Sequence, residues 1–260
     1  MSGPLPAVSH MPLRLFVDIP LGPDLELALP DDAARHVQVR RLQPGDALNL
    51  FDGRGGEWQA GILRMGKRDV QVRVGTHVRV DRELPVDLEI AVGMPANERM
   101  DALIEKATEL GVALIQPLQT ERSVLRLDAE RAAKRVAHWQ AVAVGASEQS
   151  GRTRVPAIAP VRTLAAWLGA LPEDDGGCRT RRLVLSTAEA PVLSARAAGD
   201  GPAAPRPAAW LALSGPEGGL APDEEAAAAA RGFAPVSLGP RILRADTAPL
   251  AWLAQMAVLL

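Results

Sequence analysis

The sequence predicts an α/β protein in which a small β-barrel is followed by a mainly parallel sheet with helices on both faces. Residues 13–80 consist mostly of short, closely spaced strand-like segments, which is typical of a small barrel. After residue 85, strand patterns alternate with helical patterns, as in parallel sheets. This change of texture predicts a boundary at residues 81–85 and two domains, at 1–82 and 83–260.

The composition is that of a globular protein without a strong global charge. Of the 260 residues, 47% are hydrophobic and 23% are charged, and the formal net charge is −2. The most apolar stretch, residues 250–260, is too short to span a bilayer, so no membrane segment is expected. A single cysteine, Cys178, permits no intrachain disulfide, and residues 1–10 contain no targeting signal. These features predict a cytoplasmic protein.

In the first domain, strands are expected at residues 14–17, 47–51, 58–63 and 70–74. The glycines of residues 52–56 predict a hairpin between the second and third of these strands. The same domain contains one basic cluster, which is interpreted either as a solvated face or as an RNA contact. Its members are Arg35, His36, Arg40 and Arg41.

In the second domain, strands are expected at residues 86–92, 112–118, 183–187 and 210–213. Helices are expected from Asn97 to residue 110, at residues 128–148, after Thr163 and from Ala221 onward. The low-complexity residues 195–207 are expected to form an exposed loop. This order of strands and helices is the basis for the parallel sheet.

Two glycine-containing loops follow strands of this domain. The first is Ser214-Gly215-Pro216-Glu217-Gly218-Gly219, and the second lies within residues 236–248. Glycines allow backbone amides to approach a ligand, so the first loop is either a ligand-binding loop or an ordinary loop at a sheet edge. At the carboxyl ends of parallel strands, two such loops can face one another where ligands bind.

Most standard enzyme signatures are missing from the sequence. We find no phosphate-binding Walker loop, no GxGxxG motif after a strand and no GxSxG motif. The four histidines are too far apart to suggest metal-ligand spacing, so no metal is expected. Hydrolase, kinase and metal-site interpretations are therefore disfavoured.

Together, the two loops resemble the cofactor loops of the RsmE family of 16S ribosomal RNA uridine-N3 methyltransferases. These are S-adenosylmethionine-dependent (SAM-dependent) enzymes of the SPOUT superfamily. The resemblance extends to residues 106–112, 121–123 and 147–156, and to residues 36–53 of the first domain. This chain has Asp246 where the family usually has glutamate, and Ala221 where it usually has a hydroxyl-bearing cap.

The resemblance implies a PUA-like RNA-binding β-barrel followed by a SPOUT domain with a C-terminal trefoil knot. It also implies a homodimer with its active site at the subunit interface, acting on 16S ribosomal RNA of the small ribosomal subunit. The residues implied for SAM binding are Leu185, Ser186, Thr187, Leu213, Gly215, Pro216, Glu217, Gly218, Gly219, Leu238, Gly239, Ile242 and Leu243. We expect a side chain at Gly218 to intrude on the cofactor.

Arginines are the candidates for catalysis and for RNA contact. Arg241 and Arg244 would stabilise a developing uracil anion or hold RNA phosphate, or alternatively form a salt bridge to Asp246 or Glu217. The residues expected to contact RNA are Arg35, His36, Arg40, Arg122 and Arg152.

Two other functions remain open on the sequence. One is a non-catalytic RNA-binding ribosome assembly factor, and the other is a SPOUT methyltransferase acting on another RNA.

Overall fold

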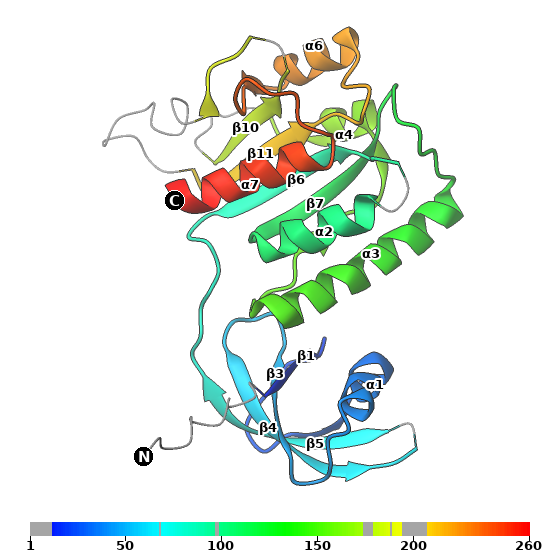
Figure 1. Ribbon diagram of the computed structural model, residues 1–260, viewed down its shortest axis with the longest axis vertical. Coiled ribbons are helices and arrows are strands. Elements are labelled where there is room, and N and C mark those ends of the chain that lie inside the picture. The colour runs from blue at the N-terminus through cyan, green and yellow to red at the C-terminus, as the bar shows by residue number, and fades with distance from the viewer. Residues whose placement is uncertain (1–11, 68, 97–98, 174–178, 188, 194–206) are drawn as a thin grey trace, which may run out of the picture. The chain divides into compact units, whose positions relative to one another are not determined.

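The computed structural model describes residues 12–67, 69–96, 99–173, 179–187, 189–193 and 207–260 (Figure 1). They form two units. The first contains the chain up to Arg82 together with Gly151–Arg154, and the second contains Glu83–Ser150 and Val155–Leu260. The expectations for Asn97, for Cys178 and for residues 195–206 lie outside the described residues.

The first unit contains a five-stranded sheet in the order β1-β3-β4-β5-β2. Its strands are β1 (Leu13–Phe16), β2 (Glu26–Ala28), β3 (Ala47–Phe51), β4 (Glu57–Met65) and β5 (Val70–Val78). The β1–β3 pair is parallel and the other pairs are antiparallel. The expected hairpin joins β3 to β4, and three of its residues need glycine because their φ angles are 78°, 94° and 71°. These are Gly53, Gly55 and Gly56.

One helix of the first unit was not expected from the sequence. Helix α1 (Asp31–Val39) lies in a region that we interpreted as strand-like. Its signals are present in the sequence: Pro30 precedes two acidic residues in the first turn, and buried Ala33 and Val37 are four residues apart. The helix places Arg35 and His36 on its exposed side.

A buried carboxylate connects distant segments of the first unit. Glu57 Oε1 accepts hydrogen bonds of 3.0 Å from Arg14 Nε and from Arg82 Nη1, and Glu57 Oε2 accepts one from Asn49. The same two arginines donate to the backbone carbonyls of Arg152 and Gly151, at 2.9 and 2.8 Å. Glu57 therefore orients the two guanidinium groups that hold Gly151–Arg154 in this unit.

The second unit is built on a seven-stranded sheet whose pairs are all parallel, which confirms the predicted parallel sheet. The order is β12-β10-β11-β6-β7-β8, and β9 also pairs with β7. The strands are β6 (Asp87–Gly93), β7 (Val112–Gln119), β8 (Ala157–Ile158), β9 (Arg162–Thr163), β10 (Thr180–Leu185), β11 (Ala209–Ser214) and β12 (Ala234–Val236).

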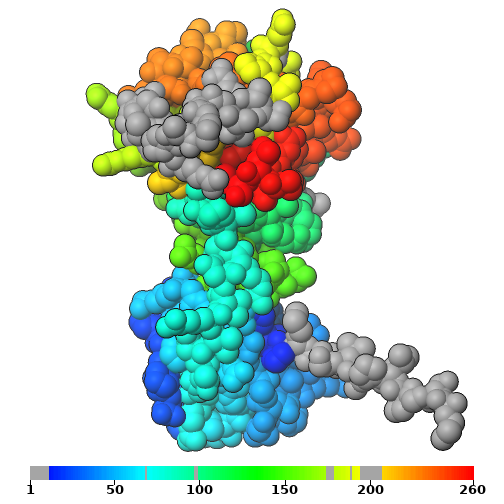
Figure 2. All heavy atoms as spheres, turned by 90° about the vertical axis from the view of Figure 1, so that its left-hand side faces the viewer, coloured from blue at the N-terminus to red at the C-terminus, as the bar shows by residue number. Residues whose placement is uncertain are grey.

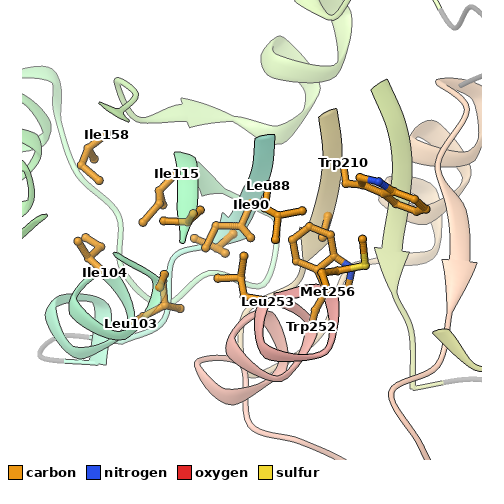
Figure 3. Packing of buried hydrophobic residues seen from close by; sticks show 14 of the residues in the cluster. Leu88, Ile90, Leu103, Ile104, Ile115, Ile158, Trp210, Trp252, Leu253 and Met256 are labelled. Carbon is orange, nitrogen blue, oxygen red and sulfur yellow. The ribbon is translucent and has the colours of Figure 1, made fainter. Parts of the chain in front are cut away.

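Helices cover both faces of this sheet, as expected (Figure 1). One face packs against α2 (Arg99–Glu109), α3 (Ala129–Ser150) and α7 (Thr247–Leu259), and the other against α4 (Leu164–Ala170) and α6 (Pro222–Ala230). Alternate residues of a central strand divide between the two cores: Trp210 of β11 faces the first, and Leu211 faces the second. Figure 3 shows the first core, in which side chains of α2 and α7 meet those of the sheet.

Helix α7 contains no charged residue and is apolar on more than its buried side. Trp252, Leu253 and Met256 are buried, whereas Val258 is 87% exposed and Leu259 is 49% exposed. Figure 2 shows the C-terminal helix, in red, at the surface of the second unit. No described helix is both long enough and apolar enough to cross a membrane. The trefoil knot remains a prediction.

We expect Glu57→Gln to lower the free energy of unfolding by about 3 kcal/mol, because it leaves two guanidinium groups without their shared anion. Urea unfolding of the full chain measures this change. The control is Glu26→Gln, which removes an exposed ion pair with Arg73 and should cost less than about 1 kcal/mol. Equal effects of the two substitutions would contradict a structural role for Glu57.

Glu89 of β6 gives a pH-dependent prediction. Burial, with a smaller contribution from nearby Asp87, raises the pKa of the Glu89 carboxyl. The folded state therefore disfavours the charged form, and the resulting penalty is present at neutral pH and disappears as pH falls through the folded-state pKa. We expect Glu89→Gln to stabilise the protein at pH 7 and to have little effect below the ordinary glutamate pKa of 4.5. Thermal unfolding across this range, with exposed Glu173→Gln as the control, checks the sign.

Candidate functional site

Three loops meet at the carboxyl edge of the second sheet. Strand β10 lies between β12 and β11, all three run parallel, and Leu185 pairs with Val236 while Val184 pairs with Leu213. The strands therefore end at nearly the same level. Backbone hydrogen bonds then join the loop after β10 to the loop after β12, since Ser237 N donates to Pro191 O at 2.9 Å. All the residues implied for cofactor binding lie at these strand ends or in the loops that follow.

The central loop, residues 214–221, needs glycine for close packing. A β-carbon at Gly215 would lie 2.8 Å from backbone atoms of Gly219 and Leu220, and one at Gly93 would lie 2.6 Å from the Pro216 ring. Gly219 has a φ of +70°, and a β-carbon there would meet nothing within 4 Å. The structure thus gives two of these glycines a packing role and leaves open space beside the third.

The space beside Gly218 is limited by a side chain of the protein. A β-carbon at Gly218 would lie 3.2 Å from the β-carbon of Arg122. A larger side chain there would therefore displace Arg122 as well as approach any bound molecule. A valine at Gly218 would not isolate the effect on a ligand, whereas an alanine at Gly215 changes the loop alone.

Acidic side chains hold both ends of this loop. Glu217 Oε1 accepts from Ala96 N at 3.2 Å and lies 3.4 Å from Arg99 Nη1. At the other end, Glu224 Oε2 accepts from Ala221 N at 3.0 Å and satisfies an amide at the start of α6. The first turn of α6 is thus stabilised although Ala221 has no capping oxygen.

The third loop, residues 237–246, carries the candidate catalytic arginines. It turns at Gly239, whose φ is 112°, and Ser237 Oγ accepts from Gly239 N at 3.2 Å. Arg241 and Arg244 are exposed and form no ion pair with any described residue, so neither salt-bridge alternative is observed. Asp246 Oδ1 is shielded from solvent and accepts no hydrogen bond. A shielded acceptor of this kind is costly unless a donor arrives from elsewhere.

The expected RNA-binding residues have different surroundings. Arg35, His36 and Arg40 are exposed in the first unit. Arg152 also belongs to that unit but is buried, at 6% exposure, which favours a structural role for its side chain. Arg122, in the second unit, donates to the carbonyls of the central loop.

Three contributors to the site were missed in the sequence. Gly93, Arg99 and Glu224 all contact the central loop or its flanks. Glu224 had a recognisable signal, because an acid three residues after a helix N-cap is typical of a capping box. Gly93 also had a signal, because it follows a predicted strand and the carboxyl ends of the parallel strands were expected to carry ligands. Arg99 had none, because no local sequence pattern links it to Glu217.

A concave surface of about 560 Å³ lies between α2 and α3. Its charged lining residues are Glu105, Lys106 and Glu109. Lys106 Nζ contacts both carboxylates, at 2.7 and 2.8 Å, and these hydrogen bonds raise its pKa further. None of the glycine loops lines this groove, so it is separate from the candidate site.

The residues at the sheet edge fit a small polar ligand. The amides of Gly218 and Leu220 donate to no described residue, and the space beside Gly219 is open. Backbone donors beside a small-residue surface can hold such a molecule without a metal, and no described group of side chains resembles a metal site.

Two family models match the chain. The model described as "RNA methyltransferase domain" matches residues 82–257, and the model described as "RNA methyltransferase PUA domain" matches residues 29–75. The first match spans most of the second unit, and the second match lies within the first unit.

Named relatives match most of the chain. Ribosomal RNA small subunit methyltransferase E of Synechocystis sp. is 36% identical over 86% of this chain and 69% of its own. The protein of the same name from Bacillus subtilis is 32% identical over 82% of each chain. Among solved structures, ribosomal RNA small subunit methyltransferase E from Neisseria gonorrhoeae bound to SAM superimposes with a TM-score of 0.84 and 35% identity, covering 96% of this chain and 98% of that one. A methyltransferase from Legionella pneumophila in complex with SAM also gives 0.84, at 33% identity, covering 95% and 97%.

Proposed function

Because the chain belongs to the ribosomal RNA small subunit methyltransferase E family, we propose that it methylates N3 of a uridine in 16S ribosomal RNA. It is a SAM-dependent RNA methyltransferase with a PUA-like domain and a SPOUT α/β domain. The observation that carries the proposal is the convergence of three glycine-containing or polar loops at adjacent parallel strand ends.

We propose that SAM is held by these loops. The residues assigned to SAM after β10 are Leu185, Ser186 and Thr187. Those after β11 are Leu213 and residues 215–219, and those after β12 are Leu238, Gly239, Ile242 and Leu243. The amides of Gly218 and Leu220, which donate to no described residue, are donors for the polar ends of the cofactor. When bound, SAM supplies an electrophilic methyl group on a sulfonium. The chain's own task is to hold the RNA base in line with that group.

We assign Arg241 and Arg244 to the uracil. N3 of uridine carries a proton, so methylation requires that proton to leave and the resulting negative charge to be stabilised. Two exposed guanidinium groups, without ion-pair partners among the described residues, are suited to that charge or to a neighbouring phosphate. Because these arginines alternate in sequence with the residues of the same loop that are assigned to SAM, one segment would contact both reactants.

The remaining assignments concern partners and location. Exposed Arg35, His36 and Arg40 support RNA binding by the first unit. The exposed apolar residues Val258 and Leu259 on uncharged α7 support a homodimer. An active site at the dimer interface remains what the family resemblance implies. We also propose a cytoplasmic location, because that is where a ribosomal RNA substrate would be met.

A non-catalytic ribosome assembly factor is the alternative that the sequence alone left open, and the family match disfavours it. It would retain the PUA-like unit and would not need open cofactor loops. The packing requirement at Gly215 and the open space at Gly219 favour the enzyme. Calorimetric titration with SAM separates the two, because only the enzyme is expected to bind it.

The proposed reaction predicts one product. Incubation of the protein and SAM with 16S ribosomal RNA or small subunits lacking the modification should give a single N3-methyluridine, located by mass spectrometry and by reverse-transcription arrest. Arg244→Ala should lower kcat about a hundredfold, because it removes a donor to developing charge, while SAM affinity stays near wild type. A methyl group on another atom or another RNA would leave the methyltransferase but overturn this substrate.

Gly215→Ala should raise the Kd for SAM at least tenfold, roughly 1.4 kcal/mol, because its β-carbon meets loop backbone at 2.8 Å. The matched control is Gly169→Ala in α4, where a β-carbon meets nothing within 4 Å. The control should bind SAM normally and be as stable as wild type or more so. Calorimetry measures binding, and thermal unfolding verifies the fold. Wild-type SAM affinity in Gly215→Ala would remove the central loop from the cofactor site.

A further inference from the structure

We propose that Arg122 is a positioning residue for the central loop, residues 214–221, and not a contact to RNA. This loop is called the SAM loop below. Arg122 Nη1 donates to Gly218 O at 2.8 Å and to Leu220 O at 3.2 Å. One guanidinium nitrogen thus holds two carbonyls of the loop. The inference rests on the proposed function, since it assumes that residues 214–221 contact SAM.

The two carbonyl contacts fix two peptide planes. A peptide unit is planar and trans, so its carbonyl and its amide point in opposite directions. The amide opposite Gly218 O is Gly219 N, which donates to Pro216 O at 2.8 Å. The amide opposite Leu220 O is Ala221 N, which donates to Glu224 at 3.0 Å. Both planes are therefore held from both sides.

Two other amides of the loop remain available to a ligand. Gly218 N and Leu220 N donate to no described residue. Their directions depend on peptide planes that adjoin those held by Arg122. By fixing the neighbouring planes before a ligand arrives, Arg122 reduces the ordering cost of binding.

Arg122 lies in a segment after β7, residues 120–126, whose backbone is held in place by hydrogen bonds. This segment is called the arm below. Thr120 N donates to Ser123 Oγ at 3.0 Å, and both side chains are buried. Glu121 N donates to Glu224 Oε1 at 2.8 Å, so the carboxylate that accepts from the start of α6 also accepts from this arm. Arg122 therefore reaches the SAM loop from a backbone that is fixed to the same helix.

The arrangement also explains the close approach at Gly218. The aliphatic part of Arg122 lies along this residue, where a β-carbon would be 3.2 Å from Cβ and 3.3 Å from Cδ of the arginine. Glycine at 218 lets the side chain pass and reach both carbonyls. The phosphate-contact alternative predicts neither this packing nor the two carbonyl bonds.

Arg122→Ala tests the proposal by three measurements. We expect the Kd for SAM to rise about tenfold, as for the loss of a charged hydrogen-bond donor. In the cofactor-free protein, amide hydrogen exchange of residues 217–221 should become faster. Affinity for 16S ribosomal RNA, and its dependence on salt, should stay at wild-type values.

Two further variants make the test specific. Arg131→Ala removes the same charge from the start of α3, where Arg131 pairs with Asp128 and contacts neither residues 120–123 nor the SAM loop, and it should leave SAM affinity and loop exchange unchanged. Arg122→Lys keeps the charge and offers a point donor, so it should recover part of the SAM affinity.

Wild-type SAM affinity and wild-type loop exchange in Arg122→Ala would overturn the proposal. A selective loss of RNA affinity with a shallower salt dependence would also overturn it, and would make Arg122 a phosphate contact. If wild-type protein bound no SAM, the proposed function would fail, whereas exchange in the cofactor-free protein would still report whether Arg122 orders the loop.

Discussion

The alignment of parallel strands β12, β10 and β11 is the constraint on which the site depends. Because these strands pair in parallel and end together, loops that are far apart in the sequence begin at the same edge. The register is strongly fixed, since both faces of β11 are buried and a shift of one residue would exchange Trp210 and Leu211 between two cores. The site thus inherits its geometry from the interior of the sheet.

Neighbouring strands then shape the loop that follows β11. The end of β6 contributes Gly93 and the Ala96 amide, and the segment after β7 contributes Arg122. Each of these groups lies at or just after the carboxyl end of its strand, so it starts close to the loop that follows β11. A loop held by fixed dipoles and charges on two sides can present its free amides without much reorganisation.

The sequence was informative where the signal is local. Apolar runs such as residues 210–213 predicted the parallel strands, and the glycines after them predicted the loops. The resemblance in residues 214–220 predicted the family. Helix α1 was missed because its short apolar pattern was read among strands. Pairs such as Arg122 with Gly218 were not predictable, because nothing in the residues near either partner specifies a contact across 96 positions.

The excursion of Gly151–Arg154 into the first unit has a consequence for biosynthesis. Arg14 and Arg82 donate to carbonyls of this segment, which is translated only after the whole of α3. The N-terminal unit therefore leaves the ribosome without part of its own structure. It is complete only after β6, α2, β7 and α3 of the second unit have also been translated. Until residues 151–154 have been added, the guanidinium groups of Arg14 and Arg82 lack these carbonyl acceptors, so the last hydrogen bonds of the N-terminal unit form only after synthesis of the second unit has begun.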